Sequence, residues 1–185
     1  MTLEVEKLSL KIREFDIEDY KQVSELWVKA GLGFRLGDDI DSVKTKMTRD
    51  PDLFLVAVER GVIVGTVMGA WDGRRGWIYH LGVLPAYRRK GIAGRLIDEL
   101  EVRMKRKGVL KVNGLVYSWN VISKRFFSER GYKVLDMTEV EKQLGQWNHK
   151  VIDPSREGGR EAKRTIAEGQ PQSGARAGRL NGKKQ

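Results

Sequence analysis

The sequence predicts an α/β (α+β) fold in which a mixed central sheet of about seven strands carries helices on both faces. Two turn signals in the middle of the chain, Arg60-Gly61 and Asp72-Gly73, predict antiparallel hairpins. A helical apolar pattern then separates the apolar runs 77–83 and 110–117, which is typical of a strand-helix-strand crossover. With 185 residues, the chain is long enough to bury the core of one domain.

The N-terminal part is expected to form a strand and two helices. Residues 8–13 alternate between apolar and polar, which predicts a strand. Asp16 is a candidate N-cap for a first helix that ends at Gly31. A second, shorter helix is expected to follow the acidic run 38–41 and to stop near Pro51.

The remaining elements follow from the same local rules. The strands expected there are 53–58, 62–70, 77–83, 110–117, 132–135 and 139–144, the last two as a final hairpin. A helix that begins at Ile92 is expected to end near Gly108. Another helix, capped by Asn120 or Ser118, is expected to close at Gly131.

The composition changes near residue 145. Residues 145–185 hold nine basic and four acidic residues, which is half of the net charge of +10, and very few large apolar groups. Such a segment buries too little surface to offset its ordering entropy. We therefore expect a domain at 1–144 and a basic, Gly-rich, disordered tail at 145–185, with a ribosome or nucleic acid as a candidate anionic partner of the tail.

Composition also excludes several classes of protein. The absence of cysteine removes disulfides, thiolate metal sites and a cysteine acyl-enzyme, and two histidines are too few for a multi-histidine metal site. No apolar run approaches the roughly 20 residues of a membrane span. The charged segment 1–11 does not read as a signal peptide. We expect a cytoplasmic protein without a metal and without a membrane partner, either a monomer or a homodimer.

A basic, glycine-rich turn lies between an apolar strand and a helix at 81–94. The first N–H groups of a helix have no internal partner, and the helix dipole favours negative charge there. Gly91 and Gly94 allow a phosphate to approach the backbone closely, and the three basic residues at 88–90 add positive charge. The expected ligand is a polyphosphate carried by a cofactor.

This turn resembles the acyl-CoA signature of the GNAT superfamily of acetyl-CoA-dependent N-acetyltransferases, through Arg88-x-x-Gly91-x-Ala93. A second match is Asn120-x-x-Ser123 followed by Gly131-Tyr132. The resemblance covers residues 8–144 and is closest to the YpeA-like and RimI-like subgroups. It implies a GNAT-like acyl-CoA N-acyltransferase fold, acetyl-CoA as cosubstrate, and direct acetyl transfer to a protein N-terminus, a lysine or a small amine.

The resemblance also implies where acetyl-CoA binds. In the family, the fourth and fifth strands splay apart and hold the pantetheine arm, while the pyrophosphate lies on backbone N–H groups of the following turn. The cofactor-binding residues expected on this basis are Leu81, Gly82, Val83, Arg88, Arg89, Lys90, Gly91, Ile92, Ala93, Gly94, Asn120 and Phe127.

The catalytic groups are less clear in the pattern. Phe127 stands where the family commonly has the tyrosine that protonates the leaving thiolate. Either Phe127 is a packed core residue and water is sufficient, or Tyr117 or Tyr132 takes that part. The candidates for the base are Tyr79, His80 and Tyr117, of which histidine titrates in the most useful range.

Two further groups have two interpretations each. The acidic run 38–41 either holds an ammonium group of the acceptor or caps a helix. Tyr79 is expected to share a strand face with Trp77 and Leu81, and Trp71, Trp77 and Trp119 either line an acceptor pocket or pack in the core. Two other functions stay open: a weakly catalytic acetyl-CoA sensor, and a nucleic-acid-binding or ribosome-binding module that uses residues 88–90 and the tail.

Overall fold

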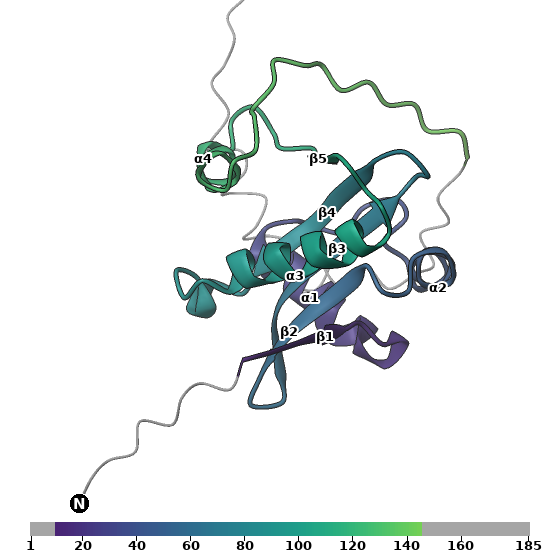
Figure 1. The fold of residues 1–185 in the computed structure, drawn as a ribbon. Coiled ribbons are helices and arrows are strands. Elements are labelled where there is room, and N and C mark those ends of the chain that lie inside the picture. The colour runs from purple at the N-terminus through teal and green to yellow at the C-terminus, as the bar shows by residue number, and fades with distance from the viewer. Residues whose placement is uncertain (1–9, 146–185) are drawn as a thin grey trace, which may run out of the picture.

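The computed structural model describes residues 10–145 and contains a single mixed sheet with helices on both faces (Figure 1). Its elements are β1 (Lys11–Glu14), α1 (Tyr20–Ala30), α2 (Ile40–Arg49), β2 (Phe54–Glu59), β3 (Val62–Trp71), β4 (Gly76–Val83), α3 (Ile92–Arg106), β5 (Val112–Gly114) and α4 (Val121–Glu129). Single turns of 3-10 helix, η1 (Ile17–Asp19) and η2 (Pro85–Tyr87), precede α1 and follow β4.

The strands lie in the order β1-β2-β3-β4-β5. The first four pair antiparallel in chain order: short turns join β2 to β3 and β3 to β4, whereas α1 and α2 lie between β1 and β2. The β5 strand pairs parallel to β4, and α3 is the crossover between them. Both hairpin predictions and the strand-helix-strand prediction are confirmed.

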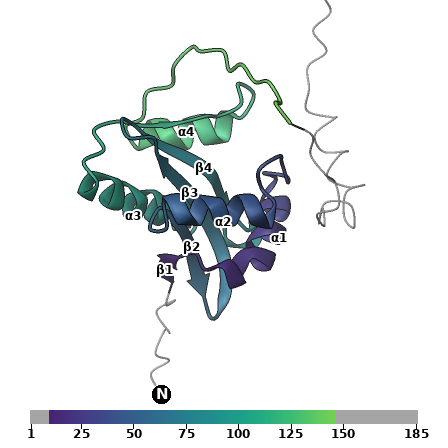
Figure 2. The same ribbon diagram turned by 90° about the vertical axis from the view of Figure 1, so that its right-hand side faces the viewer.

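The helices form a layer on each side of the sheet. Figure 2 shows α3 on one side, α1 on the other, and α2 crossing beside the strands. Each layer encloses its own apolar core. The core under α3 contains Leu96, Leu100 and Met104, and the core under α1 contains Leu26 and Trp27 stacked towards Phe54.

Two glycines allow α3 to lie close to the sheet. A Cβ on Gly69 of β3 would lie 2.5 Å from the Cδ1 atom of Leu100, and a Cβ on Gly76 of β4 would lie 2.7 Å from the sulfur of Met104. The backbone of both strands is therefore in direct contact with the helix. This close packing fixes the second half of α3 against β3 and the start of β4.

The prediction of about seven strands is wrong, because residues 10–145 contain five. Residues 132–135 and 139–144 form no strand, and β5 is limited to three residues instead of 110–117. Alternation produces a strand only where a partner edge exists, and β5 offers a very short one. The apolar side chains of this segment stay exposed, namely Val134, Leu135, Met137, Val140 and Leu144.

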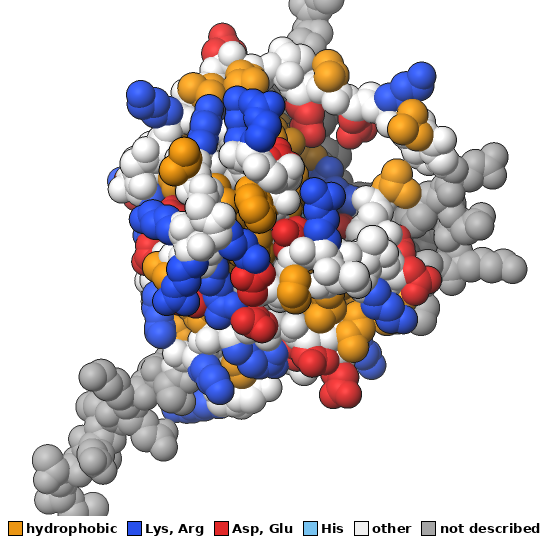
Figure 3. Space-filling model, turned by 45° about the vertical axis from the view of Figure 1, so that its right-hand side comes forward, with side chains coloured by type: hydrophobic (Ala, Val, Ile, Leu, Met, Phe, Trp, Pro, Cys, Tyr) orange, Lys and Arg blue, Asp and Glu red, His pale blue; other side chains and the backbone are white. Residues whose placement is uncertain are grey.

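The surface of the described part is charged and mixed. Figure 3 shows Asp and Glu side chains lying among the Lys and Arg side chains of one face. No helix within residues 10–145 is long and apolar enough to cross a membrane. The proposed tail, except Gly145, and residues 1–9 lie outside the described residues, so the domain boundary stays a prediction.

Candidate active site

The sheet opens between β4 and β5. Pairing between the two strands is limited to three positions and ends at Ile78 with Gly114, whereas β4 continues along β3 as far as Val83. The N–H of Leu84 donates to the carbonyl of Val64 on β3 at 3.0 Å. Because backbone groups alternate along a strand, the N–H groups of Val83 and Leu81 point towards the open side.

A β-bulge lies at this opening. Met68 pairs with Tyr79 but Thr66 pairs with Gly82, so two residues of β4, His80 and Leu81, face one residue of β3. His80 has a φ of +48°, in the left-handed region that a non-glycine residue rarely occupies. The extra residue reverses the alternation of side chains from that point.

The bulge decides which residues of β4 face α1. Tyr79 and His80 both lie on the α1 face, where the His80 ring is 4.5 Å from the Trp27 ring. Leu81 instead packs against the core under α3. The expectation that Leu81 shares a face with Trp77 and Tyr79 is therefore wrong, because regular alternation was assumed through a bulge.

His80 is paired with a buried carboxylate. Its Nε2 lies 3.0 Å from Oδ1 and 3.1 Å from Oδ2 of Asp38, in the loop between α1 and α2. The Asp38 side chain is only 6% exposed, and its Oδ2 also accepts from the N–H of Arg35 at 2.8 Å. Sequence reasoning missed this pair. The only available signal was that the acidic run holds more carboxylates than one helix cap needs.

The other carboxylates of that run have local partners. Asp39 caps α2 by accepting from the N–H of Ser42 at 3.0 Å, so the capping interpretation is confirmed for this residue. Asp41 lies 3.6 Å from Lys44 on the surface. The ammonium-binding interpretation therefore has no support from Asp39 or Asp41.

Tyr79 lies beside an aromatic pair on β4. Its ring stacks on Trp77 with a centroid distance of 6.4 Å, and the indole N–H of Trp77 donates to Asp72 at 3.0 Å. Burial raises the pKa of Tyr79, and the charge of Asp72 raises it further. The Tyr79 hydroxyl therefore stays protonated at neutral pH, which makes it a weaker base candidate than His80.

A second aromatic pair follows β5. Tyr117 stacks on Trp119 with a centroid distance of 5.3 Å, and the Arg35 guanidinium carbon lies 5.4 Å from the centre of the Tyr117 ring. Arg35 thus connects the α1–α2 loop to the segment after β5 across the opening. Trp119 is 60% exposed, whereas Trp71 packs against the core under α3.

The start of α3 has the features of an anion site. Arg89 and Gly91 have φ values of +62° and +76°, which turn the chain sharply into the helix. No side chain caps this helix, in contrast to α2 and α4. A Cβ on Gly91 would meet nothing within 4 Å, so the space beside this N-cap residue is open. These features fit the pyrophosphate of acetyl-CoA.

The basic side chains of this turn do not all point to that space. Arg88 donates from Nε to the carbonyl of Val83 at 3.2 Å and from Nη2 to the carbonyl of Ala30 at 2.9 Å. The Lys90 ammonium lies 4.8 Å from the centre of the Tyr87 ring. The Arg88 side chain therefore ties the end of β4 to the end of α1, and any contact with phosphate at this position comes from its backbone.

Gly94 also has a role that the sequence did not indicate. Its missing Cβ leaves room for Arg130, whose Nη1 would lie 2.9 Å from that Cβ. Arg130 donates to the carbonyl of Gly94 at 3.2 Å and pairs with Asp98. The space beside Gly94 is therefore occupied by the Arg130 side chain, which comes from the end of α4. Ile92 is buried in the core, so its side chain is not available to a ligand, and Ala93 is partly buried against the same core.

The candidates on α4 make structural contacts. Asn120 caps the helix by accepting from the N–H of Ser123 at 3.0 Å. Phe127 makes edge-to-face contacts with Phe126 and Tyr132 and packs against the core under α3, which agrees with the packed interpretation. The Tyr132 hydroxyl donates to Glu101 at 2.6 Å, and burial together with this carboxylate raises its pKa. Tyr132 is therefore a poor proton donor.

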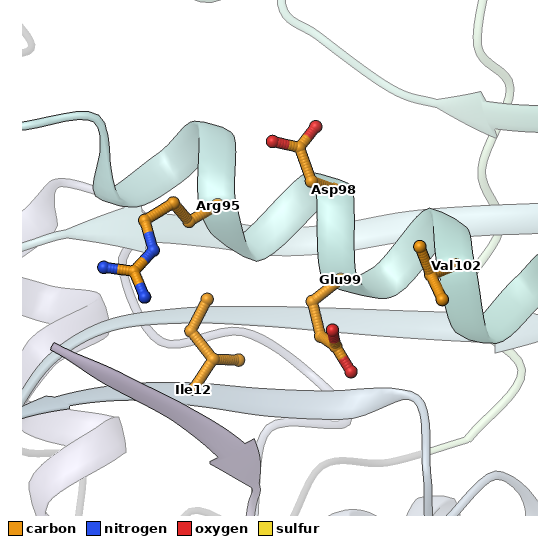
Figure 4. Close-up of a pocket in the computed structure, with 5 residues that line it drawn as sticks. All are labelled: Ile12, Arg95, Asp98, Glu99 and Val102. Carbon is orange, nitrogen blue, oxygen red and sulfur yellow. The ribbon is translucent and has the colours of Figure 1, made fainter.

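A separate groove lies at the opposite edge of the sheet. It has a volume of about 410 Å³ and runs between β1 and α3, with Ile12, Arg95 and Glu99 among its lining residues (Figure 4). Since β1 and β5 are the two edges of the sheet, this groove is distant from the opening beside β4. Within residues 10–145, no group of three or more His, Asp and Glu side chains could hold a metal ion.

Comparisons with known proteins agree with this geometry. The model of the acetyltransferase (GNAT) family matches residues 17–132, more than half of the chain. The chain is 38% identical over 127 residues to Acetyltransferase SG1711 of Sodalis glossinidius, covering 69% of this chain and 89% of that protein. It is 37% identical over 135 residues to Acetyltransferase ECA0875 of Pectobacterium atrosepticum, covering 73% and 96%.

A solved structure shares the fold. The PaiA N-acetyltransferase from Thermoplasma acidophilum, in complex with coenzyme A, matches with a TM-score of 0.64 at 23% identity. The match covers 71% of this chain and 94% of that one.

Proposed function

The chain belongs to the GNAT acetyltransferase family and is an acetyl-CoA-dependent acyltransferase, and from that premise we propose that it acetylates a primary amine of a protein N-terminus, a lysine or a small molecule. The observation that carries the proposal is the opening between β4 and β5, with the His80 bulge on its α1 face. This arrangement puts a titratable side chain beside an unpaired strand edge.

Acetyl-CoA supplies the acetyl group as a thioester: the amine nitrogen bonds to the acetyl carbon, the carbon–sulfur bond breaks, and coenzyme A leaves as a thiolate. The N–H groups of Leu81 and Val83 are suited to bond an extended chain along the open edge of β4, whereas the Val83 carbonyl already accepts from Arg88. The N–H groups of residues 89–94 are suited to hold the pyrophosphate, since no side chain caps α3.

His80 is the favoured base among the three candidates. It lies on the α1 face beside the opening, and its Nδ1 is suited to take the proton that the amine loses. Tyr79 and Tyr117 remain alternatives on the same side. Water supplies the proton for the thiolate, because Phe127 has none to give and a thiolate is a tolerable leaving group.

A weakly catalytic acetyl-CoA sensor is the second candidate function. Phe127 favours it, because an aromatic ring in the core replaces the hydroxyl that commonly serves as the acid. A nucleic-acid-binding module receives less support from the described residues, since the Arg88 guanidinium already binds two backbone carbonyls. Binding by the tail stays a separate prediction.

Isotope-labelled acetyl-CoA distinguishes these functions. The full chain is incubated with peptides that have a free N-terminus, with N-terminally blocked lysine peptides, with polyamines and with aminoglycosides, and the products are read by mass spectrometry. Transfer to one class, lost in Gly91→Glu, supports the enzyme. Thermal stabilisation by acetyl-CoA without transfer to any class contradicts it and favours the sensor.

A further inference from the structure

Asp38 and His80 come from distant parts of the chain and meet on the α1 face. Asp38 belongs to the loop between α1 and α2, and His80 to the bulge of β4, 42 residues later. Both carboxylate oxygens lie within 3.1 Å of His80 Nε2. No local sequence rule requires this contact, because neither residue caps or continues a secondary-structure element through it.

The contact determines which ring nitrogen carries the proton. A carboxylate only accepts hydrogen bonds, and His80 Nε2 lies 3.0 Å and 3.1 Å from the two oxygens of Asp38, so a hydrogen must lie between them. His80 must therefore present Nε2–H to it, in the neutral and in the charged imidazole alike. In the neutral ring, the lone pair is then on Nδ1, the nitrogen turned away from Asp38.

Neighbouring groups hold both partners in place. Trp27 packs on the His80 ring at 4.5 Å with an interplanar angle of 52°. The Tyr20 hydroxyl donates to the Asp38 carbonyl at 2.9 Å, and the Arg35 N–H donates to the carboxylate. These contacts restrict the orientations of the Asp38 carboxyl group and the His80 imidazole. Such restriction is needed if the imidazole proton is to stay on one ring nitrogen.

We propose that Asp38 is a positioning residue that fixes the Nε2–H tautomer of His80, so that Nδ1 receives the proton of the acceptor amine. This inference rests on the proposed acetyl transfer, in which the amine nitrogen bonds to the acetyl carbon and the thiolate leaves. The Asp38 carboxylate also stabilises the imidazolium that forms.

The substitutions Asp38→Asn and Asp38→Ala separate the charge from the tautomer. The Arg35 N–H can only donate, so the amide oxygen of asparagine takes the place of Oδ2. At this place it lies 3.1 Å from His80 Nε2 and still accepts from Nε2–H, but the negative charge that stabilises the imidazolium is lost. Alanine leaves no side-chain acceptor for Nε2–H, so the imidazole proton is no longer held on one nitrogen.

Nitrogen-15 NMR reads the tautomer without any substrate. The chain has two histidines, and His80→Gln identifies the signals of His80 by their loss. At about pH 9, we expect Nε2–H alone in the wild type and in Asp38→Asn, and a mixture of the Nε2–H and Nδ1–H tautomers in Asp38→Ala. A wild-type protein with the proton on Nδ1 overturns the inference, whatever its activity.

Kinetics on the acceptor found by mass spectrometry complete the test. We expect kcat to fall about 10-fold or more in Asp38→Asn and about 100-fold in His80→Gln, with the KM for acetyl-CoA little changed. Asp39→Asn is the matched control, because it removes the same charge one residue away and asparagine still caps α2. Equal losses in the Asp38 and Asp39 variants overturn the positioning role.

The two hypotheses fail in different ways. If the wild type carries Nε2–H but transfers acetyl to no acceptor, the proposed function is wrong and the catalytic role of the pair with it, although the pair itself is intact. If transfer occurs but Asp38→Ala keeps the tautomer and kcat of the wild type, only the positioning role is overturned.

Discussion

The Arg88 guanidinium donates to the carbonyl of Ala30, the last residue of α1, at 2.9 Å. A second bond from the same side chain reaches the carbonyl of Val83 at the end of β4. The first basic residue of the acyl-CoA signature therefore joins the end of β4 to the end of α1. Its side chain provides a hydrogen-bond donor for the Ala30 carbonyl, one of the last carbonyls of α1, which have no partner within the helix.

This contact predicts separate effects for neighbouring basic residues. We expect Arg88→Ala to lower the free energy of unfolding by about 1 kcal/mol, because two hydrogen bonds are lost at a partly solvated site. Acetyl-CoA affinity should change little. Arg89→Ala is the control, with the opposite expectation of weaker acetyl-CoA binding at unchanged stability. Urea unfolding and titration calorimetry measure both, and a large affinity loss in Arg88→Ala alone would refute this division.

Gly91 and Gly61 form a matched pair for testing the anion site. Both have positive φ values, +76° and +78°, and a Cβ on either would meet nothing within 4 Å. Replacement by Glu should therefore cost a similar amount of stability, roughly 1 kcal/mol of backbone strain. Only Gly91→Glu should abolish acetyl-CoA binding, since it puts bulk and negative charge in front of α3. Equal affinity in the two variants would contradict the pyrophosphate site.

Phe127→Tyr tests whether proton supply to the thiolate limits the reaction. We expect kcat to rise modestly, by about threefold, because a hydroxyl is introduced where the family commonly has one. Phe126→Tyr is the control, since the two rings are in edge-to-face contact and only one occupies the position in question. An unchanged kcat in Phe127→Tyr means that another step is limiting.

Tyr20 predicts a loss of stability at alkaline pH. Burial raises the pKa of Tyr20 from 10.0 to about 12, with help from the charges of Asp39 and Asp38. A raised pKa in the folded state means that the contribution is complete below pH 10 and is lost as the pH rises towards 12. The stability difference between wild type and Tyr20→Phe should therefore shrink over that range. Urea midpoints at several pH values measure it, and a constant difference would disprove the raised pKa.

Removal of residues 146–185 tests the proposed domain boundary. We expect the thermal midpoint to stay within a few degrees, because the tail has too few large apolar groups to add to a core. Any salt-sensitive binding to RNA should disappear with the tail. A large drop in the midpoint would show that the tail contributes to the folded structure.

Much of the fold could be predicted because its signals are local. Asp16 and Asn120 cap helical segments as expected, and Gly31, Gly108 and Gly131 have the positive φ values of helix ends. The strands at 54–59, 62–71 and 76–83 agree with their apolar runs within one or two residues. The prediction of a final hairpin is wrong because strand pairing depends on distant residues. Alternation at 132–144 describes a strand without saying whether an edge is available to pair with it.

The anion-binding turn could be predicted, but the use of its side chains could not. Gly91 and the first turn of α3 follow from a glycine-rich sequence before a helix. The contacts of Arg88 with Ala30 and of Gly94 with Arg130 depend on how α1 and α4 pack against this turn. Assignment to the YpeA-like or RimI-like subgroup also stays a prediction, because the acceptor is not known.

By itself the sequence determined the succession of helices and strands, the hairpins and the acyl-CoA signature, since caps, turns and periodicity depend on neighbouring residues. Only the tertiary structure decided that His80 faces α1, because one extra residue in a bulge reverses the alternation of β4. It also decided that Asp38 meets His80, because that contact joins residues 42 positions apart. The chemistry of the site depends on such long-range packing, which local pattern does not encode.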